Sequence, residues 1–284
     1  MKKIKITTDT ASDISLSTAE KYGIHLMPIN IAIDGKQYKD RYDISPEEFF
    51  DILTRCDKIP KTSQITVSEH MDEFKKFSDE YTIIHIPISG SASGTLQSAT
   101  LAANEIMDEN PDSDITIVDS SSFSYGYGYY VVEAAKMANE GRSKDEIIEF
   151  LEDGFSHTKI FFVPDTLEYL KKGGRISPKA KILADILDIT PILAIEEGLV
   201  MNKDKVRGKK KVIGKITDMV AEHIDSSHPQ PIVVMHALDE EKANKVVDAL
   251  KEKTGVTSYV TEVLGPTIGI HTGPGAFGII FRGK

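Results

Sequence analysis

Two hydroxyl-rich segments of the chain carry residue types that bind anions. Residues 88–97, ISGSASGTLQ, follow an apolar run and place four hydroxyls in seven residues, with Ser93 at the start of an expected helix. One serine there is enough to cap a helix, so the additional hydroxyls and glycines equally fit an anion site at a helix N-terminus. Residues 61–66, KTSQIT, add Thr62, Ser63 and the amide of Gln64. A loop whose hydroxyls cap the local backbone explains this second segment when it is taken alone.

A third segment, residues 263–281, sets His271 among five glycines and two prolines. Glycine permits unusual backbone angles and the close approach of another group. An imidazole can donate a hydrogen bond to a carboxylate or phosphate, and near neutral pH it can carry a positive charge. The alternative is a tight turn with a structural histidine. We expect a glycine-rich loop in which His271 meets a ligand.

Other chemistries find little support in the sequence. Ser93 lacks the Gly-x-Ser-x-Gly elbow of a hydrolase nucleophile, and the chain has no Gly-x-x-x-x-Gly-Lys-Ser/Thr loop for a nucleotide. Cys56 is the only cysteine, and no His-x-x-x-His pair accompanies it, so we expect no metal site. The single cysteine and a polar start that differs from a signal peptide predict a cytoplasmic protein.

The charge balance limits the partners that the protein can have. A net charge of −10 disfavours nucleic acids and repels anions at long range, so any anion site must be made locally. Residues 203–211 reverse this sign, because six basic residues including Arg207 face only Asp204. Such a run is usually a solvated face or helix start, but it also fits docking of an acidic partner or a phosphate group. No apolar run is long enough to cross a membrane.

The elements that must position these residues alternate as strand and helix up to about residue 156. This order is typical of a mainly parallel sheet with helices on both faces. Ser45, followed by Pro46 and Glu48, predicts a capping box before an apolar helix face. The expected strands are 3–9, 24–34, 82–89 and 114–120, and the expected helices are 17–23, 45–55, 93–107, 129–141 and 143–151.

Beyond about residue 157 the pattern changes to a mixed sheet, because 189–206 has the pattern of a hairpin that turns at Glu197-Gly198. We therefore expect an α/β protein of two domains, 1–157 and 158–284. The remaining expected elements are strands 159–165, 231–238, 258–264 and 276–281, and helices 167–187 (in two pieces split at Gly173-Gly174), 208–225 and 239–255.

Taken together and in order, the motifs of the chain resemble those of the DegV family, the fatty-acid-binding subunits of bacterial fatty acid kinase. The resemblance covers residues 7 to 279. The motifs that carry it are TTDTASDI (7–14), KTSQ (61–64), SASGTLQSA (91–99), VDSSSFSYGYG (118–128), DTLEYLKKGGRIS (165–177), KVRGKKK (205–211) and GPTIGIHTGPGAFGI (265–279).

The resemblance implies two α/β domains with a long-chain fatty acid in a tunnel between them. It implies that Thr62 and Ser93 bind the carboxylate, that His271 lies beside it with Thr272 in support, and that Arg207 meets the kinase or the phosphate. The chain would then be a binding subunit, without cofactor or catalysis of its own, that presents the carboxylate to a separate fatty acid kinase for conversion to an acyl phosphate. Two alternatives are a serine acyl hydrolase that uses Ser93 and His271, and a phosphosugar-binding protein.

Overall fold

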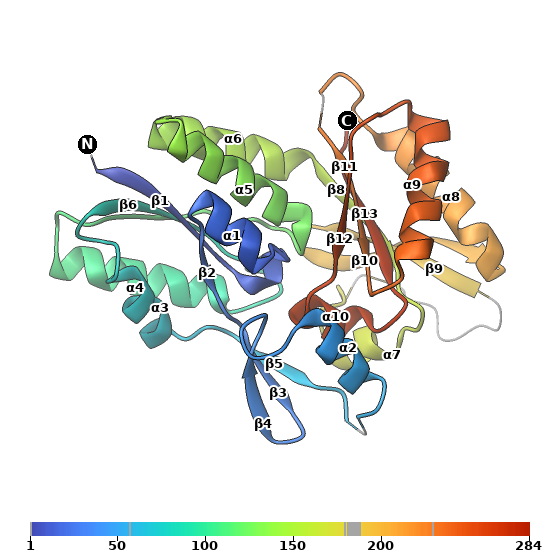
Figure 1. Ribbon diagram of the computed structural model, residues 1–284, viewed down its shortest axis with the longest axis horizontal. Coiled ribbons are helices and arrows are strands. Elements are labelled where there is room, and N and C mark those ends of the chain that lie inside the picture. The colour runs from blue at the N-terminus through green and yellow to red at the C-terminus, as the bar shows by residue number, and fades with distance from the viewer. Residues whose placement is uncertain (1, 57, 179, 181–188, 229) are drawn as a thin grey trace.

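The computed structural model describes residues 2–56, 58–178, 180, 189–228 and 230–284. Its strands form three sheets (Figure 1), of which the first is parallel and has the order β2-β1-β6-β7. Its strands are β1 (Lys3–Asp9), β2 (His25–Met27), β6 (Tyr81–Ile86) and β7 (Asp114–Ile117). The run Ile83–Ile86 is buried on both faces, which is typical of a parallel strand covered by helices.

Helices cover both faces of the parallel sheet, with α5 and α6 on one side and α3 and α4 on the other (Figure 1). The predicted capping box is confirmed, since Ser45 Oγ accepts from Glu48 N and Glu48 Oε2 accepts from Ser45 N. The helices of this half are η1 (Thr10–Ser12), α1 (Leu16–Tyr22), α2 (Pro46–Leu53), α3 (Val67–Phe74), α4 (Thr95–Glu109), α5 (Tyr125–Asn139) and α6 (Lys144–His157).

A small antiparallel sheet, with the order β4-β3-β5, corrects two predictions. The single strand expected over 24–34 is divided at Pro28, which cannot donate to a sheet ladder, so β3 (Asn30–Ile33) leaves the parallel sheet and pairs with β4 (Lys36–Lys39). The segment expected as a loop around Thr62 forms β5 (Lys61–Ser63), because its backbone pairs with β3, where Ile31 stands opposite Thr62.

The third sheet is mixed, as predicted, and has the order β10-β9-β8-β13-β11-β12. The predicted hairpin is confirmed: Glu196 pairs with Leu199, and Glu197 and Gly198 both have positive φ, as its tight turn requires. Helices α8 and α9 pack on one face of this sheet (Figure 1). Its strands are β8 (Thr158–Val163), β9 (Ile189–Glu196), β10 (Leu199–Arg207), β11 (Ile232–His236), β12 (Tyr259–Val263) and β13 (Phe277–Arg282).

The helices of the second half are α7 (Glu168–Gly173), η2 (Lys209–Lys211), α8 (Val212–His223), α9 (Glu240–Thr254) and α10 (Pro266–Thr272). Helix α7 ends as predicted at Gly174, which has a φ of 70°. The second helical piece was expected to continue to residue 187, but residues 175–178 form no helix, and 179 and 181–187 lie outside the described residues.

The predicted loop around His271 is wrong, because Pro266–Thr272 forms helix α10. Pro266 occupies the first turn, where its missing N–H has no intrahelical partner to lose. Gly269 serves packing here, since a Cβ atom at this position would fall 2.8 Å from the Phe50 ring and 2.9 Å from that of Phe49. Figure 1 shows α10 between the two large sheets, beside α2 and α7.

The larger of two hydrophobic clusters includes side chains from both halves of the chain, such as Phe49 and Ile84 together with Phe162 and Met235. A smaller cluster lies between the mixed sheet and helices α8 and α9. The strands of the parallel sheet fall within 3–117 and those of the mixed sheet within 158–282. The division into domains 1–157 and 158–284 stays a prediction.

Candidate ligand-binding site

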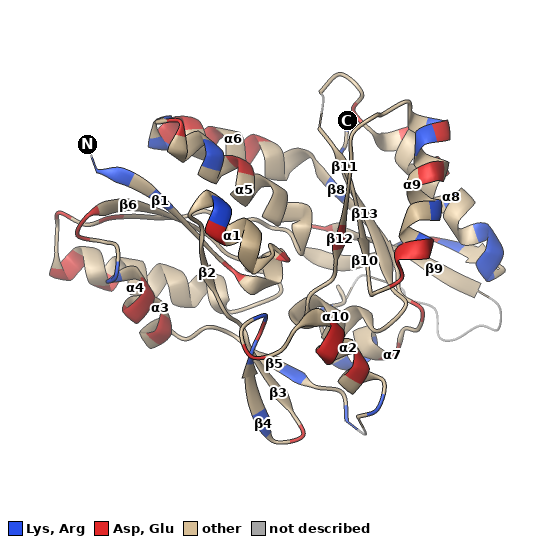
Figure 2. Ribbon diagram, viewed as in Figure 1, with Lys and Arg blue, Asp and Glu red and all other residues tan. Residues whose placement is uncertain are grey.

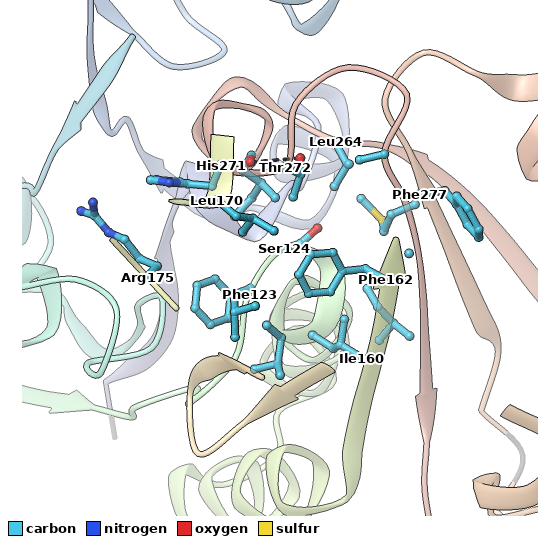
Figure 3. A pocket seen from close by; sticks show the side chains of 17 residues that line it. Phe123, Ser124, Ile160, Phe162, Leu170, Arg175, Leu264, His271, Thr272 and Phe277 are labelled. Carbon is cyan, nitrogen blue, oxygen red and sulfur yellow. Dashed lines mark hydrogen bonds between the residues drawn. The ribbon is translucent and has the colours of Figure 1, made fainter. Parts of the chain in front are cut away.

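An apolar pocket lies between α10, the mixed sheet and the segment before α5 (Figure 3). It encloses about 670 Å³ of empty space, counted with the open solvent at its mouth. Its lining is almost wholly hydrocarbon and aromatic. The lining residues are Phe123, Ser124, Ile160, Phe162, Leu170, Arg175, Ile195, Val200, Met235, Leu264, Ile268, His271, Thr272, Ala276, Phe277, Gly278 and Ile280.

A polar pocket adjoins the apolar one and brings together three of the predicted site residues, Thr62, Ser93 and His271. The two pockets share four lining residues: Phe123, Arg175, Ile268 and His271. His271 and Arg175 lie at the same end of the apolar lining, and Phe277 lies at the other end (Figure 3). The remaining residues of the polar pocket are Ile29, Ser63, Gln64, Ile88, Ala92, Gly94 and Thr267.

The two hydroxyls reach the polar pocket from different elements. Thr62 lies on β5, and its side chain makes no hydrogen bond with another described residue. Ser93 precedes α4; its Oγ accepts from Thr95 N at 3.2 Å and is hydrogen-bonded to the Thr95 hydroxyl at 2.9 Å. The N-cap of α4 is Gly94 rather than Ser93, so Ser93 lies just before the helix, bonds to its first residue and also lines the pocket. Both hydroxyls can donate to an anion there.

His271 differs in its charge from the sequence-based expectation. Burial and, secondarily, the positive charge of Arg175 together lower the pKa of its imidazole to about 4, so the ring is neutral near pH 7. Its Nδ1 atom is buried without a hydrogen-bond partner and faces Gly173, where a Cβ atom would fall 2.2 Å away. The other ring nitrogen, Nε2, therefore remains to meet a ligand.

Arg175 supplies the fixed positive charge that His271 lacks, and sequence reasoning did not single it out. Its Nε donates to the backbone oxygen of Ala92 at 3.4 Å and its Nη1 donates to that of Gly173. Among the described carboxylates, none forms an ion pair with it. Arg175 follows the turn at Gly174 in the motif LKKGGRIS, and its bond to Ala92 places its side chain against the N-terminal half of the chain.

A basic pocket adjoins the same two side chains, Arg175 and His271, from the outside. Lys58, Lys61 and Lys172 line it, and all three are exposed. Figure 2 shows basic positions on β5 and on the segment before it. This cluster is a local concentration of positive charge on a chain of net charge −10.

Buried carboxylates hold α10 in place, a role that the sequence did not reveal. Gly265 N, just before the helix, donates to Asp13 Oδ1 at 2.8 Å, and Arg41 pairs with the same oxygen at 3.1 Å. The backbone N–H and hydroxyl of Thr267 both donate to Asp40 Oδ2. Burial raises the pKa of Asp13, and it raises that of Asp40 to about 6. The N-terminal motif containing Asp13 thus positions the helix that carries His271.

Two predicted site residues lie apart from the polar pocket. Thr272 lines only the apolar pocket, and its hydroxyl donates to the Ile268 backbone oxygen at 3.2 Å. Arg207 is exposed at the end of β10 and lines none of the pockets described here. The basic run around it is partly neutralised by distant acids, since Lys203 pairs with Glu196 and Lys209 pairs with Asp165.

The geometry gives no support to hydrolysis or metal chemistry. Ser93 and His271 line one pocket but make no hydrogen bond to each other, and the Ser93 hydroxyl pairs with Thr95. Within the described part of the chain, no three His, Cys, Asp or Glu side chains gather to hold a metal ion. No described helix combines the length and apolar character that crossing a bilayer requires.

Comparison with known proteins identifies the family to which this chain is similar. The model of the DegV family of uncharacterised proteins matches residues 3–284. A DegV domain-containing protein of Caldanaerobacter subterraneus is 38% identical over 285 residues, which cover all of both chains.

Two solved structures share both the fold and over a quarter of the sequence. A DegV family protein from Thermus thermophilus, described by its fatty acid binding, is 28% identical, with a TM-score of 0.85 over 99% of this chain and 100% of that one. DegV from Bacillus subtilis, described as a fatty acid binding protein, is 27% identical, with a TM-score of 0.87 over the whole of both chains.

Proposed function

The chain belongs to the DegV family, and on that premise we propose that it binds a long-chain fatty acid. The acyl tail lies in the apolar pocket and the carboxylate in the polar pocket. One observation carries this proposal: His271 and Arg175 line both pockets, so a single elongated molecule with an apolar body and an anionic end fits across them. Relatives that share the fold are described as fatty acid binding proteins.

Burial of the tail supplies most of the affinity in this proposal. Each buried CH₂ contributes ~0.8 kcal/mol, so a chain of a dozen or more methylenes gains enough to offset the cost of ordering it. The apolar lining offers no hydrogen-bond donor that would favour a polar ligand along most of its length. The head-group residues then need only orient and neutralise the carboxylate.

Four side chains are suited to the carboxylate. The hydroxyls of Thr62 and Ser93 donate to its oxygens, as does Nε2–H of the neutral His271, and hydrogen bonds to an ionised acceptor are stronger than neutral ones. Arg175 supplies positive charge in a partly buried site, where charges are screened less than in water. The neutral state of His271 suits it to donate a hydrogen bond next to the Arg175 cation.

We also propose that the bound carboxylate is presented to a separate fatty acid kinase and that this chain has no catalysis of its own. In that reaction a carboxylate oxygen forms a bond to the terminal phosphorus of ATP held by the kinase, the bond to the bridging oxygen breaks, and ADP leaves with the electron pair. The exposed lysines beside the head-group end support such an encounter. Arg207, exposed on β10, is a further contact for the kinase or the phosphate.

The test of binding is mass spectrometry of an organic extract from the purified protein. Wild type is expected to carry close to one fatty acid per chain. Thr62→Val with Ser93→Ala removes two bonds worth ~1.5–3 kcal/mol each, so affinity is expected to fall roughly a hundredfold or more and the ligand to be lost. The matched control is Thr257→Val with Ser68→Ala, at two exposed positions whose side chains make no hydrogen bond with other described residues.

An empty wild-type extract, together with failure to bind added fatty acid, would overturn the proposal. Full retention of the ligand by the double variant would show that Thr62 and Ser93 do not contribute to binding of the carboxylate. The presentation step is tested separately by incubating the pure protein with ATP and a fatty acid. Acyl phosphate is expected only after a fatty acid kinase is added, and its formation without one would contradict the division of roles.

A further inference from the structure

A second polar pocket, called here the rear pocket, lies behind the apolar one. It shares two lining residues with the apolar pocket, Ile160 and Ile195. The polar and charged lining of the rear pocket includes Ser122, Lys203 and His223, and its aromatic lining is Phe155 and Phe161. Ile160 and Ile195 therefore lie at the boundary between the apolar pocket and the polar rear pocket.

The two isoleucines come from neighbouring antiparallel strands. Phe161 of β8 stands opposite Ala194 of β9, at the end of the pairing between these two strands. Ile160 and Ile195, the next residue on each strand, line both pockets just beyond this point. In Figure 3 Ile160 lies away from His271 and Arg175 and on a different side of the lining from Phe277, so a tail that starts at the head-group end can approach either residue.

Two further observations mark this partition. Ile160 is 8% exposed and packs so tightly on α5 that a Cβ atom at Gly126 would fall 2.5 Å from its Cδ1 and 2.7 Å from Ser122 Oγ. Ser122 is 4% exposed, lines the rear pocket, and its hydroxyl has no hydrogen-bond partner. A buried hydroxyl without a partner is unusual in a native protein.

We propose that the Ile160–Ile195 pair is the acyl-length stop of this protein and closes the apolar pocket against the rear pocket. The inference rests on the proposed fatty acid binding and deepens it, because it names the residues that set the longest chain bound. A methyl terminus that passed the pair would enter a polar space and lose the benefit of burial. Ser122 is placed to bond a polar group that reaches that space, such as the terminal hydroxyl of an ω-hydroxy acid.

Competition between saturated fatty acids of increasing length tests the stop. Ile160→Ala and Ile195→Ala are each expected to move the preferred chain to a longer one, with about a fourfold change in relative affinity for each added methylene that becomes buried. Ile160→Phe is expected to move it to a shorter one. The matched control is Ile147→Ala, since Ile147 is fully buried in α6 and lines none of the four pockets described here; it should lower stability and leave the length preference unchanged.

The outcomes separate this inference from the function on which it rests. If wild type binds no fatty acid, the proposed function fails and the stop, which rests on it, fails with it. If wild type and the folded Ile160 and Ile195 variants bind fatty acids with one unchanged length preference, the stop is overturned. A change of preference in Phe277→Ala alone would also overturn it, because the chain would then end at the other side of the pocket.

The rear pocket has its own readout. In Ile160→Ala, an ω-hydroxy acid that reaches past the stop is expected to gain affinity relative to the plain acid of equal length. Adding Ser122→Ala should lower the affinity for the ω-hydroxy acid about tenfold and leave the affinity for the plain acid unchanged. A gain that survives Ser122→Ala would exclude Ser122 as the partner of the hydroxyl.

Discussion

The Nδ1 atom of His271 lies against the backbone of Gly173, at a distance that leaves no room for a methyl group. A Cβ atom built on Gly173 falls 2.2 Å from Nδ1, although the φ of Gly173 is one that other residues adopt readily. The last residue of α7 and the last turn of α10 therefore fix the plane of the imidazole between them. Glycine is required at 173 because of this contact.

Gly173→Ala is expected to displace the His271 ring. Overpacking of a filled site typically costs ~1–3 kcal/mol of stability, and a ring turned away from the carboxylate loses its hydrogen bond to it. Affinity for a long-chain fatty acid should fall about tenfold or more. Calorimetric titration of the variant stripped of lipid measures the affinity, and denaturant unfolding measures the stability.

Gly214→Ala is the matched control for this change. Gly214 lies within α8, and a Cβ atom there meets no atom within 4 Å. Because alanine is favoured over glycine in a helix by ~1 kcal/mol, the control should keep its affinity and gain some stability. Unaltered fatty acid affinity in Gly173→Ala would show that the contact does not position the ring for binding.

The glycines around His271 illustrate how far sequence reasoning reaches. Their number correctly predicted close approach of other groups, and Gly273 confirms this, since a Cβ atom there would fall 2.3 Å from the Tyr169 ring. The sequence did not reveal that the approaching groups are side chains of the protein itself, such as the Phe50 ring at Gly269. A helix rich in glycine has weak local propensity and forms here through tertiary packing, which local patterns do not contain.

The strands with strong local patterns were predicted well, but the pockets were not. The turn residues Glu197 and Gly198 predict a hairpin from the local sequence alone. The apolar residues that line a cavity are of the same types as those that fill a core, so a cavity has no such local pattern. Thr62, Ser93 and His271 were brought together by a family resemblance. Arg175 was missed because nothing in its local sequence indicates that it shares a pocket with a histidine on another helix.

A second prediction concerns the charge of His271. Burial and, secondarily, the Arg175 cation lower the pKa of the imidazole to about 4. Arg175→Gln removes the repulsion and leaves the burial, so the pKa should rise but stay below its usual 6.5. Titration of the ring protons by nuclear magnetic resonance, with His271→Gln to assign the signal, measures this value.

Arg175→Lys retains the positive charge and serves as the control for Arg175→Gln. It should keep the pKa of His271 close to that of wild type, even though the bonds to Ala92 and Gly173 change. An unchanged pKa in Arg175→Gln would mean that the guanidinium does not act on the ring. Equal rises in both variants would assign the effect to a packing change.

A third prediction follows from the anchor of α10 at Asp40. Burial raises the pKa of this carboxyl from 3.8 to about 6 in the folded protein, against the opposing influence of Arg41 and the hydrogen bond from Thr267. Because the folded-state pKa is the higher one, the folded state binds more protons between these two values. The contribution of Asp40 to stability is therefore fully present below about pH 4 and is lost as the pH rises to 6 and above.

Asp40→Asn retains an oxygen that can accept from Thr267 but does not ionise, so its stability relative to wild type should increase between pH 4 and pH 7. A shift of about two pKa units corresponds to roughly 3 kcal/mol at most. Urea unfolding of both proteins across this pH range measures the difference between their free energies of unfolding. The contributions of the carboxylates that both proteins contain cancel in this difference. Asp72→Asn, at an exposed position on α3, is the matched control. A flat or falling difference for Asp40→Asn would mean that this carboxyl is ionised at no cost in the folded protein, and that the anchor of α10 is an ordinary charged hydrogen bond.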